Sequence, residues 1–176
     1  SLAHAQGVVD KINAETEKEG NEAYLDGSEG IEQLSAQQAL ELVPILRGDA
    51  IAAAAIEWDA QDIDVDRMLQ GGWADTVAEI AGVRPLGLRP LRRSAVLIPA
   101  PEGHDITRWP LFANAGDQWY AKPEAGKLMV SPAEEDPVEP HDLWADDMVI
   151  AEGLHRFEQA VTIPVTRVEH SWAGMR

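Results

Sequence analysis

The residues of this sequence that could do chemistry are an arginine and three aromatic side chains. Trp172 and Arg176 lie within the last six residues of the sequence, and Trp119 and Tyr120 are neighbours on a predicted hairpin. An arginine beside an aromatic wall can hold a carboxylate through two parallel hydrogen bonds, and the three aromatic residues are candidates for that wall. A second interpretation stays open, in which the tryptophans are core residues and the arginine is a frayed terminal residue.

A run of four aspartates between residues 59 and 66 resembles a calcium loop only in part. Counting from Asp62, Arg67 stands where the calcium loop needs glycine, and Trp73 stands where it needs glutamate. Both positions are required by the mechanism of calcium binding. We therefore interpret the run as a solvated turn, with Asp64 as a helix cap.

The histidines do not indicate a metal site either. All five are scattered without a metal-binding pair, at positions 4, 104, 141, 155 and 170. We expect His170 to lie on a strand, and a role in an acid–base pair is the alternative for it. No metal ligand set follows from the sequence.

Composition excludes several classes of function. The sequence has 176 residues, with 31 Asp and Glu against 14 Lys and Arg, and a formal charge of −17. That charge argues against nucleic acid and anionic membranes as partners, because both need a clustered cationic surface. The absence of cysteine excludes disulfides and thiolate chemistry, and a cytoplasmic protein without a signal peptide is the expectation. No G-x-G-x-x-G, Walker or G-x-S-x-G motif is present.

The first half of the sequence reads as helices. The apolar pattern predicts an amphipathic helix over residues 2–19. Ser35 begins an S-x-x-Q capping box for a second helix that runs to about Leu42. Residues 50–56 are ambiguous between helix and strand. The spacing of apolar residues from Trp73 predicts a further helix, closed by Gly82.

The second half reads as short strands and one long helix. Residues 95–98 form the expected buried strand, and residues 118–122 and 127–131 form a hairpin whose turn uses a glycine. Asp142 or Asp146 caps a helix with the apolar stripe Ile150, Leu154, Phe157 and Val161, which Pro164 ends. A final strand is expected over residues 165–172. Helices and strands do not alternate strictly, which predicts an α+β fold with a mainly antiparallel sheet.

Four stretches, in order, resemble the D-amino-acid oxidase, glycine oxidase and D-amino-acid dehydrogenase family of FAD-dependent oxidoreductases. S-W-A-G-M-R at residues 171–176 is similar to the family's S-W-A-G-[LM]-R motif. Residues 34–44 resemble its L-S-x-x-E-A-x-x-x-x-P stretch, residues 53–64 its A-x-x-E-P-D-A-x-D-V-D stretch, and residues 120–128 its Y-x-x-P-x-x-x-G-x-L hairpin. The shared order makes the resemblance fairly specific.

The resemblance implies one particular part of such an enzyme, the substrate domain. The Rossmann glycine fingerprint of the family is absent, and Gly71-Gly72 stands where the family has more FAD-domain strands, just before Trp73 and Ala74. The expectation is a single substrate-binding domain, excised or engineered from the parent and built from segments 1–70 and 73–176. In the family this domain is a mainly antiparallel sheet with helices on one side.

The resemblance also implies roles for residues and partners. Arg176 would hold the carboxylate of a small amino acid or amine substrate, with Tyr120, Trp119 and Trp172 at the pocket wall. FAD would belong to the missing FAD-binding domain, so the chain alone would bind no flavin tightly and show no turnover. The face left by that domain would be exposed and could form a homodimer. Acidic residues such as those at 134–136 read as solvated surface. A stand-alone ligand-binding or interaction module, or a folding scaffold without a ligand, is the alternative.

Overall fold

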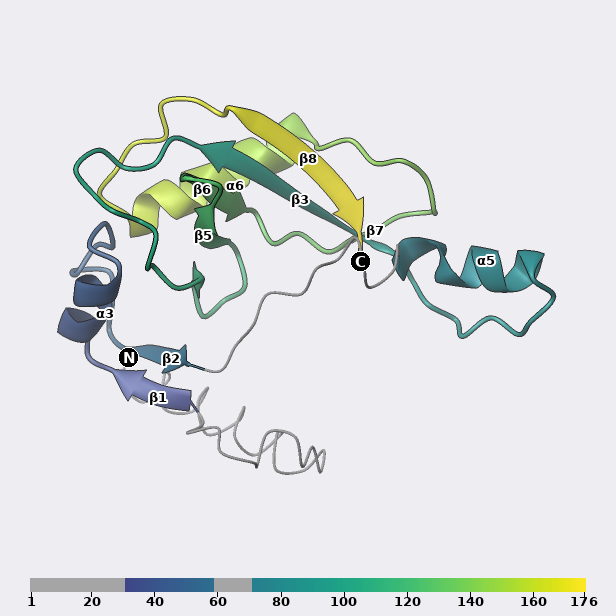
Figure 1. Ribbon diagram of the computed structural model, residues 1–176, viewed down its shortest axis with the longest axis horizontal. Coiled ribbons are helices and arrows are strands. Elements are labelled where there is room, and N and C mark those ends of the chain that lie inside the picture. The colour runs from purple at the N-terminus through teal and green to yellow at the C-terminus, as the bar shows by residue number, and fades with distance from the viewer. Residues whose placement is uncertain (1–30, 59–70) are drawn as a thin grey trace. The chain divides into compact units, whose positions relative to one another are not determined.

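The computed structural model of the protein describes residues 31–58 and 71–176. The chain divides into two compact units, Ser1–Asp62 and Ile63–Arg176, and each is described by itself. The helix expected over residues 2–19 and the aspartate run between residues 59 and 66 lie outside the described residues. Figure 1 labels the helices and strands.

The first unit contains a two-stranded sheet and a short helix. Strand β1 (Ile31–Leu34) pairs antiparallel with β2 (Ala54–Glu57), and helix α3 (Ala36–Leu42) follows β1 directly. The predicted capping box is confirmed, since the Gln38 amide donates to Ser35 Oγ at 3.3 Å and the Ser35 amide donates to Gln38 Oε1 at 2.9 Å. The ambiguous residues 50–56 contribute a strand from residue 54 onward. Among residues 31–58, the buried apolar side chains of this unit are Leu34, Ala39, Val43 and Ile45.

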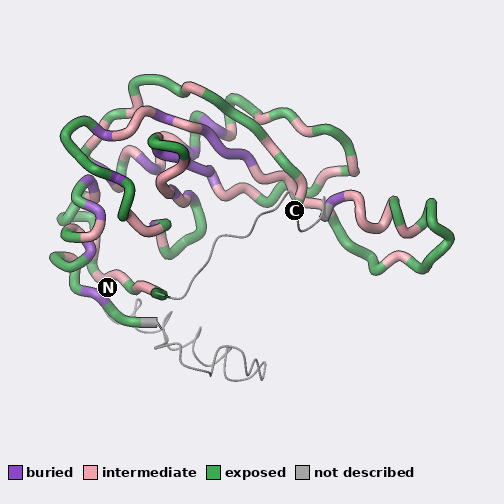
Figure 2. The backbone as a smooth tube through the Cα atoms, viewed as in Figure 1, coloured by how far each residue is buried: buried purple, intermediate pink, exposed green. Residues whose placement is uncertain are grey.

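The second unit begins with a short helix on its surface. A 3₁₀ turn, η1 (Gly71–Trp73), leads into helix α5 (Ala74–Ile80). The predicted end at Gly82 is confirmed, because Gly82 has a φ of +69° and the Val83 amide bonds back to Ala78 at 3.0 Å. No residue of α5 is buried, as the pink and green tube of this segment in Figure 2 shows. The helix therefore contributes no side chain to the core of this unit.

A six-stranded sheet forms the centre of the second unit. Its strands are β3 (Leu91–Ile98), β4 (Phe112–Ala113), β5 (Tyr120–Glu124), β6 (Lys127–Ser131), β7 (Asp136–Pro137) and β8 (His170–Met175). Strand β3 is central: β6 and β7 pair along one of its edges and β8 along the other. All these pairs are antiparallel. The predicted α+β class is confirmed.

One face of this sheet is covered by helix α6 (Asp147–Ala160). Pairing places Val96, Val130, Ala121 and Phe112 in one row across four strands, and the rings of Phe112 and Phe157 of α6 lie 6.5 Å apart. Because neighbouring residues of a strand point to opposite faces, this row defines the face beneath α6. The core of the unit therefore lies between α6 and the sheet, in purple on the tube of Figure 2.

Capping by Asp146 rather than Asp142 fixes the start of α6. Asp146 Oδ1 accepts hydrogen bonds from the amides of Met148 at 2.9 Å and Val149 at 3.2 Å. The helix ends at Ala160, ahead of Pro164, and its predicted stripe is buried at Ile150 and Phe157.

The bounds of three predicted strands are wrong. The buried strand expected over residues 95–98 begins at Leu91. The first hairpin strand begins at Tyr120 rather than at residue 118, because the side chain of Asn114 accepts from the Gln118 amide at 2.7 Å and holds that residue in a loop. The last strand spans His170–Met175 rather than residues 165–172. The Val165 amide donates to Glu158 Oε1 instead, at 2.7 Å.

The hairpin turn is confirmed and sharper than predicted. Only Ala125 and Gly126 connect the two strands, and both have positive φ, of 48° and 76°. Two-residue turns of this kind match the twist of the flanking strands.

Within residues 31–58 and 71–176, none of the helices combines the length and apolar character needed to cross a membrane.

Candidate functional site

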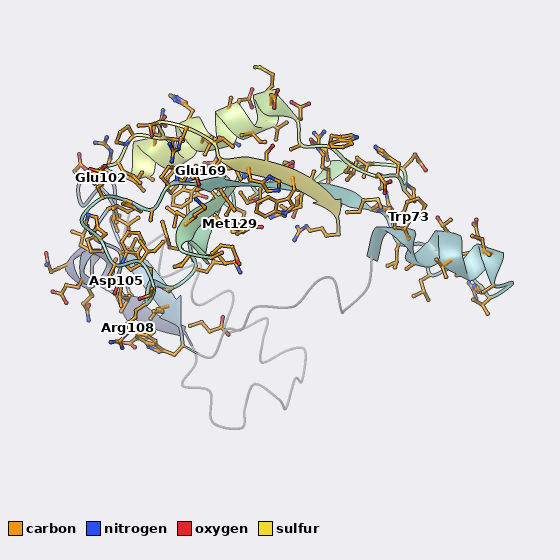
Figure 3. The ribbon with its side chains drawn as sticks, turned by 45° about the horizontal axis from the view of Figure 1, so that its top comes forward. Trp73, Glu102, Asp105, Arg108, Met129 and Glu169 are labelled. Atoms are coloured by element: carbon orange, nitrogen blue, oxygen red, sulfur yellow. The ribbon has the colours of Figure 1, made fainter. Side chains whose placement is uncertain are left out.

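The candidate site lies on the sheet face opposite α6. Pairing places His170, Leu97, Met129 and Lys122 in one row across β8, β3, β6 and β5. Alternation along the strands puts Arg93, Tyr120 and Trp172 on this same face. We call it the arginine face, defined by Arg93, Tyr120, Trp172 and Arg176. Figure 3 shows Met129 over the sheet strands that carry it.

Arg93 is held between an aromatic ring and a carboxylate. Its guanidinium carbon lies 5.7 Å from the centre of the Tyr120 ring, a cation–π distance. Its Nη2 donates to Glu135 Oε1 at 3.1 Å. The Nε of Arg93 is buried and has no hydrogen-bond partner in the described part of the chain. A buried donor without an acceptor is costly to keep, so stability alone does not explain this arginine.

Arg176 has an ordered backbone, unlike the frayed terminal residue that was the alternative. It exchanges two backbone hydrogen bonds with Leu91, both at 3.0 Å, and so continues the pairing of β8 with β3. Its guanidinium forms an ion pair with the same Glu135 carboxylate oxygen as Arg93. Half of its side chain remains exposed. Two arginines, from β3 and from the end of β8, therefore meet at one glutamate.

Trp172 stands beside this cluster on β8. It is partly exposed and its ring stacks on that of His170, with centroids 5.7 Å apart and an interplanar angle of 24°. The predicted strand position of His170 is confirmed. An organic anion can pack against an exposed, stacked aromatic pair on a face that also carries arginines.

The structure separates Trp119 from the other predicted site residues. Its side chain is 4% exposed and its ring lies 5.3 Å from Phe157 and 5.9 Å from Phe112, beneath α6. It therefore occupies the core, on the opposite face from Tyr120. Trp73 and Ala74 lie where η1 meets α5 (Figure 3).

The charges on the arginine face differ from those of the chain as a whole. In a sequence with a formal charge of −17, this face gathers Arg93, Arg176 and Lys122. Lys122 pairs with Glu124 at 3.3 Å. At the start of β8, the Lys127 and Arg167 side chains donate to Glu169, which lowers the pKa of that carboxyl. The face is therefore suited to anions.

Sequence reasoning missed two of these residues, Arg93 and Glu135. The expected strand covers residues 95–98 and so leaves out Arg93. The expectation of solvated surface at residues 134–136 is wrong for Glu134, whose side chain is 8% exposed and lies 3.9 Å from Arg92 Nε. Glu135 precedes β7 and is far in the sequence from both arginines that it binds, so no local pattern marks it.

Outside the arginine face, the described residues offer no metal-ligand cluster, and a hollow in the first unit has an uncharged lining. Among these residues, no group of three or more histidine, aspartate or glutamate side chains could hold a metal ion. An open hollow of about 330 Å³ lies in the first unit, between the end of β1 and the residues before β2. Its lining has no charged side chain: Gln33, Leu34, Ser35, Ala36, Ala52 and Ala53.

Comparison with known proteins agrees with the fold class. No protein-family model matches the sequence. Among solved structures, the chain is similar to iminodiacetate oxidase from Chelativorans sp. BNC1, with a TM-score of 0.60 and 17% sequence identity. The match covers 97% of this chain and 57% of that chain, so the sequence spans little more than half of that protein. At this identity the comparison shows a shared fold.

Proposed function

We propose that this chain is the substrate-binding part of an FAD-dependent amino-acid oxidoreductase, in which Arg176 holds the substrate carboxylate. The observation that carries the proposal is the arginine face: Arg176 continues the pairing of β8 with β3, its side chain is half exposed, and Trp172 and Tyr120 lie on the same sheet face. The shared fold with an iminodiacetate oxidase supports the reaction class. Holding the carboxylate fixes the carbon atom next to the amine, which is how positioning contributes to rate.

The described residues do not fit FAD itself. Dinucleotides are bound where a parallel strand turns into a helix through a glycine-rich loop, and every strand pair of the described residues is antiparallel. The sequence also lacks the G-x-G-x-x-G fingerprint. The proposal therefore assigns the flavin to a separate FAD-binding domain and leaves to this chain the binding and orientation of substrate.

Exposed apolar side chains around α5 support such a partner domain. Val77, Ile80, Val83, Leu86 and Leu88 are all at least half exposed. They follow one another along α5 and the connection to β3, so they form a surface rather than isolated positions. We propose that this surface meets the FAD-binding domain in the parent enzyme.

The proposal is tested by ligand-detected NMR on the purified chain. N-methylglycine, which has a carboxylate and an amine, is expected to show saturation transfer, and dimethylamine, which has no carboxylate, is not. Arg176→Gln should weaken N-methylglycine binding by about tenfold or more, because it removes a charge-assisted pair of hydrogen bonds. Arg84→Gln is the control, since Arg84 is an exposed arginine outside the arginine face.

Visible absorbance tests the assignment of the flavin. The purified chain is expected to be colourless. When free FAD and amino acids are added to it, the FAD is expected to stay oxidised. A yellow protein that is bleached by small amino acids would contradict the proposed division of labour. Equal binding of N-methylglycine by the wild-type and Arg176→Gln proteins would contradict the role of Arg176. Loss of binding in Arg84→Gln as well would show that the effect is not specific.

A further inference from the structure

We infer that Arg93, Glu135 and Arg176 act as one receptor that prefers ligands with a single carboxylate over ligands with two. The inference rests on the proposed function and adds to it the substrate class and two further binding residues. It starts from the way the two guanidiniums share one glutamate, which nothing in the sequence motif of Arg176 specifies.

The geometry makes the three side chains a unit. Arg93 on β3 and Arg176 after β8 both donate through Nη2 to Glu135 Oε1, next to β7. Since both bonds end on the same oxygen, the guanidiniums are drawn toward one point between the strands. Glu135 is 56% exposed at its side chain, and Arg176 is 50% exposed. A ligand can therefore reach the cluster from solvent.

Charge then selects the ligand. Two arginines and one glutamate leave a net charge of +1, which a single carboxylate neutralises. The neighbouring cation on this face, Lys122, is paired with Glu124. A second carboxylate on the ligand would meet Glu135 with both arginines already engaged, and like charges placed together oppose binding. Iminodiacetate, the compound in the name of the structural neighbour, has two carboxylates and is the informative contrast.

Arg93 is positioned for this role by its other contact. The Tyr120 ring lies under its guanidinium, which limits the orientations that the planar group can take. Because its Nε is buried, the donors that a ligand can reach are those at the Nη end. Arg93 and Arg176 would thus present their donors to one carboxylate from two sides.

The experiment compares N-methylglycine with iminodiacetate as NMR probes on five proteins: wild type, Arg176→Gln, Glu135→Gln, Arg93→Gln and the control Glu152→Gln. Wild type is expected to prefer N-methylglycine. Glu135→Gln raises the receptor charge to +2 and should improve iminodiacetate binding relative to N-methylglycine by about fivefold. Arg93→Gln lowers the charge to zero and should weaken both probes. Glu152, on the exposed side of α6, should leave the ratio unchanged.

Each outcome decides something different. If wild type binds N-methylglycine and Arg176→Gln abolishes that binding, while Glu135→Gln and Arg93→Gln leave the probe ratio and affinities unchanged, the receptor inference is wrong and the proposed function stands. If neither probe binds any of the proteins, both are overturned. Circular dichroism shows whether each variant is folded. Glu135→Gln and Arg93→Gln test the receptor independently of each other. A reversal of preference in Glu135→Gln alone supports the receptor as inferred.

Discussion

Asp75 shows how a single carboxylate organises a stretch of backbone. It lies in the first turn of α5, and its oxygens accept hydrogen bonds from three successive amides, Leu86 at 2.8 Å and Gly87 and Leu88 at 2.7 Å. The Leu86 bond is the largest cause of a pKa below the ordinary value of 3.8, and the Leu88 and Gly87 bonds act in the same direction. The connection after α5 is thereby tied back to the helix.

The pH dependence of this tie follows from the direction of the shift. A carboxyl whose folded pKa is depressed contributes stability above its unfolded pKa and loses it as the pH falls through the folded value. We expect the amide NMR signals of Gly87 and Leu88 to titrate with a midpoint below the ordinary pKa of 3.8. In Asp75→Asn they should not titrate. Movement with a midpoint above 3.8 would contradict the assignment.

At the same scale, the sequence named residues that the structure places on one face. Arg176, Tyr120 and Trp172 share the arginine face because their strand positions alternate. Glu135 could not be anticipated, because its partners lie on β3 and at the end of β8, far from it in the sequence. Trp119 lies in the core, whereas its neighbour Tyr120 lies on the arginine face. Consecutive residues of an extended chain point to opposite sides.

At the scale of the elements, α6 packs closely at Gly153 against Pro132, the residue that follows β6. A Cβ placed on Gly153 would lie 2.3 Å from Pro132 Cβ and 2.8 Å from Pro132 Cα. Alanine favours helices by about 1 kcal/mol over glycine, but overpacking of this kind costs about 1–3 kcal/mol. The contact is with backbone, which cannot move aside easily, so the cost should prevail.

Gly153→Ala is therefore expected to destabilise the protein by up to about 2 kcal/mol net, measured by urea denaturation. Ala151→Gly on the exposed side of the same helix is the control, and it should lose about 1 kcal/mol through propensity alone. A gain in stability for Gly153→Ala would mean that α6 can shift away from Pro132 without cost.

Elements were easier to predict where a local signal exists. The Ser35 capping box, the Gly82 helix end and the Gly126 turn all depend on residues within a few positions of one another, and all three are confirmed. The strand boundaries at Tyr120 and His170 depend on the side chains of Asn114 and Glu158, which accept from the amides of Gln118 and Val165, four and seven residues later, and so remove them from the sheet. Periodicity cannot detect such competition for backbone hydrogen bonds.

For the molecule as a whole, the apolar surface around α5 predicts self-association. Ile80 and Leu86 are both 83% exposed, and the net charge of −17 opposes contact between copies. Salt screens that repulsion, so light scattering at high protein concentration and about 0.5 M NaCl should show an average mass above 19.2 kDa.

The double variant Ile80→Ser, Leu86→Ser should return that mass to the monomer value, because it removes the most exposed apolar side chains of the surface. Trp144→Ser, at an equally exposed position outside that surface, serves as the comparison and should leave the mass of the wild type unchanged. A wild-type protein that stays monomeric in high salt would show that this surface does not associate with itself, and a homodimer would then be excluded under those conditions.

The pairing of β3 with β8 has a consequence for the order in which the fold assembles. Leu97 pairs with His170, about seventy residues later, whereas β5 and β6 pair across a two-residue turn. Loop-closure entropy makes such distant contacts slow to form. Arg93 and Arg176 are brought together only by this long-range pairing. In refolding kinetics followed by Trp172 fluorescence, the arginine face should thus form after the hairpin and α6 have formed.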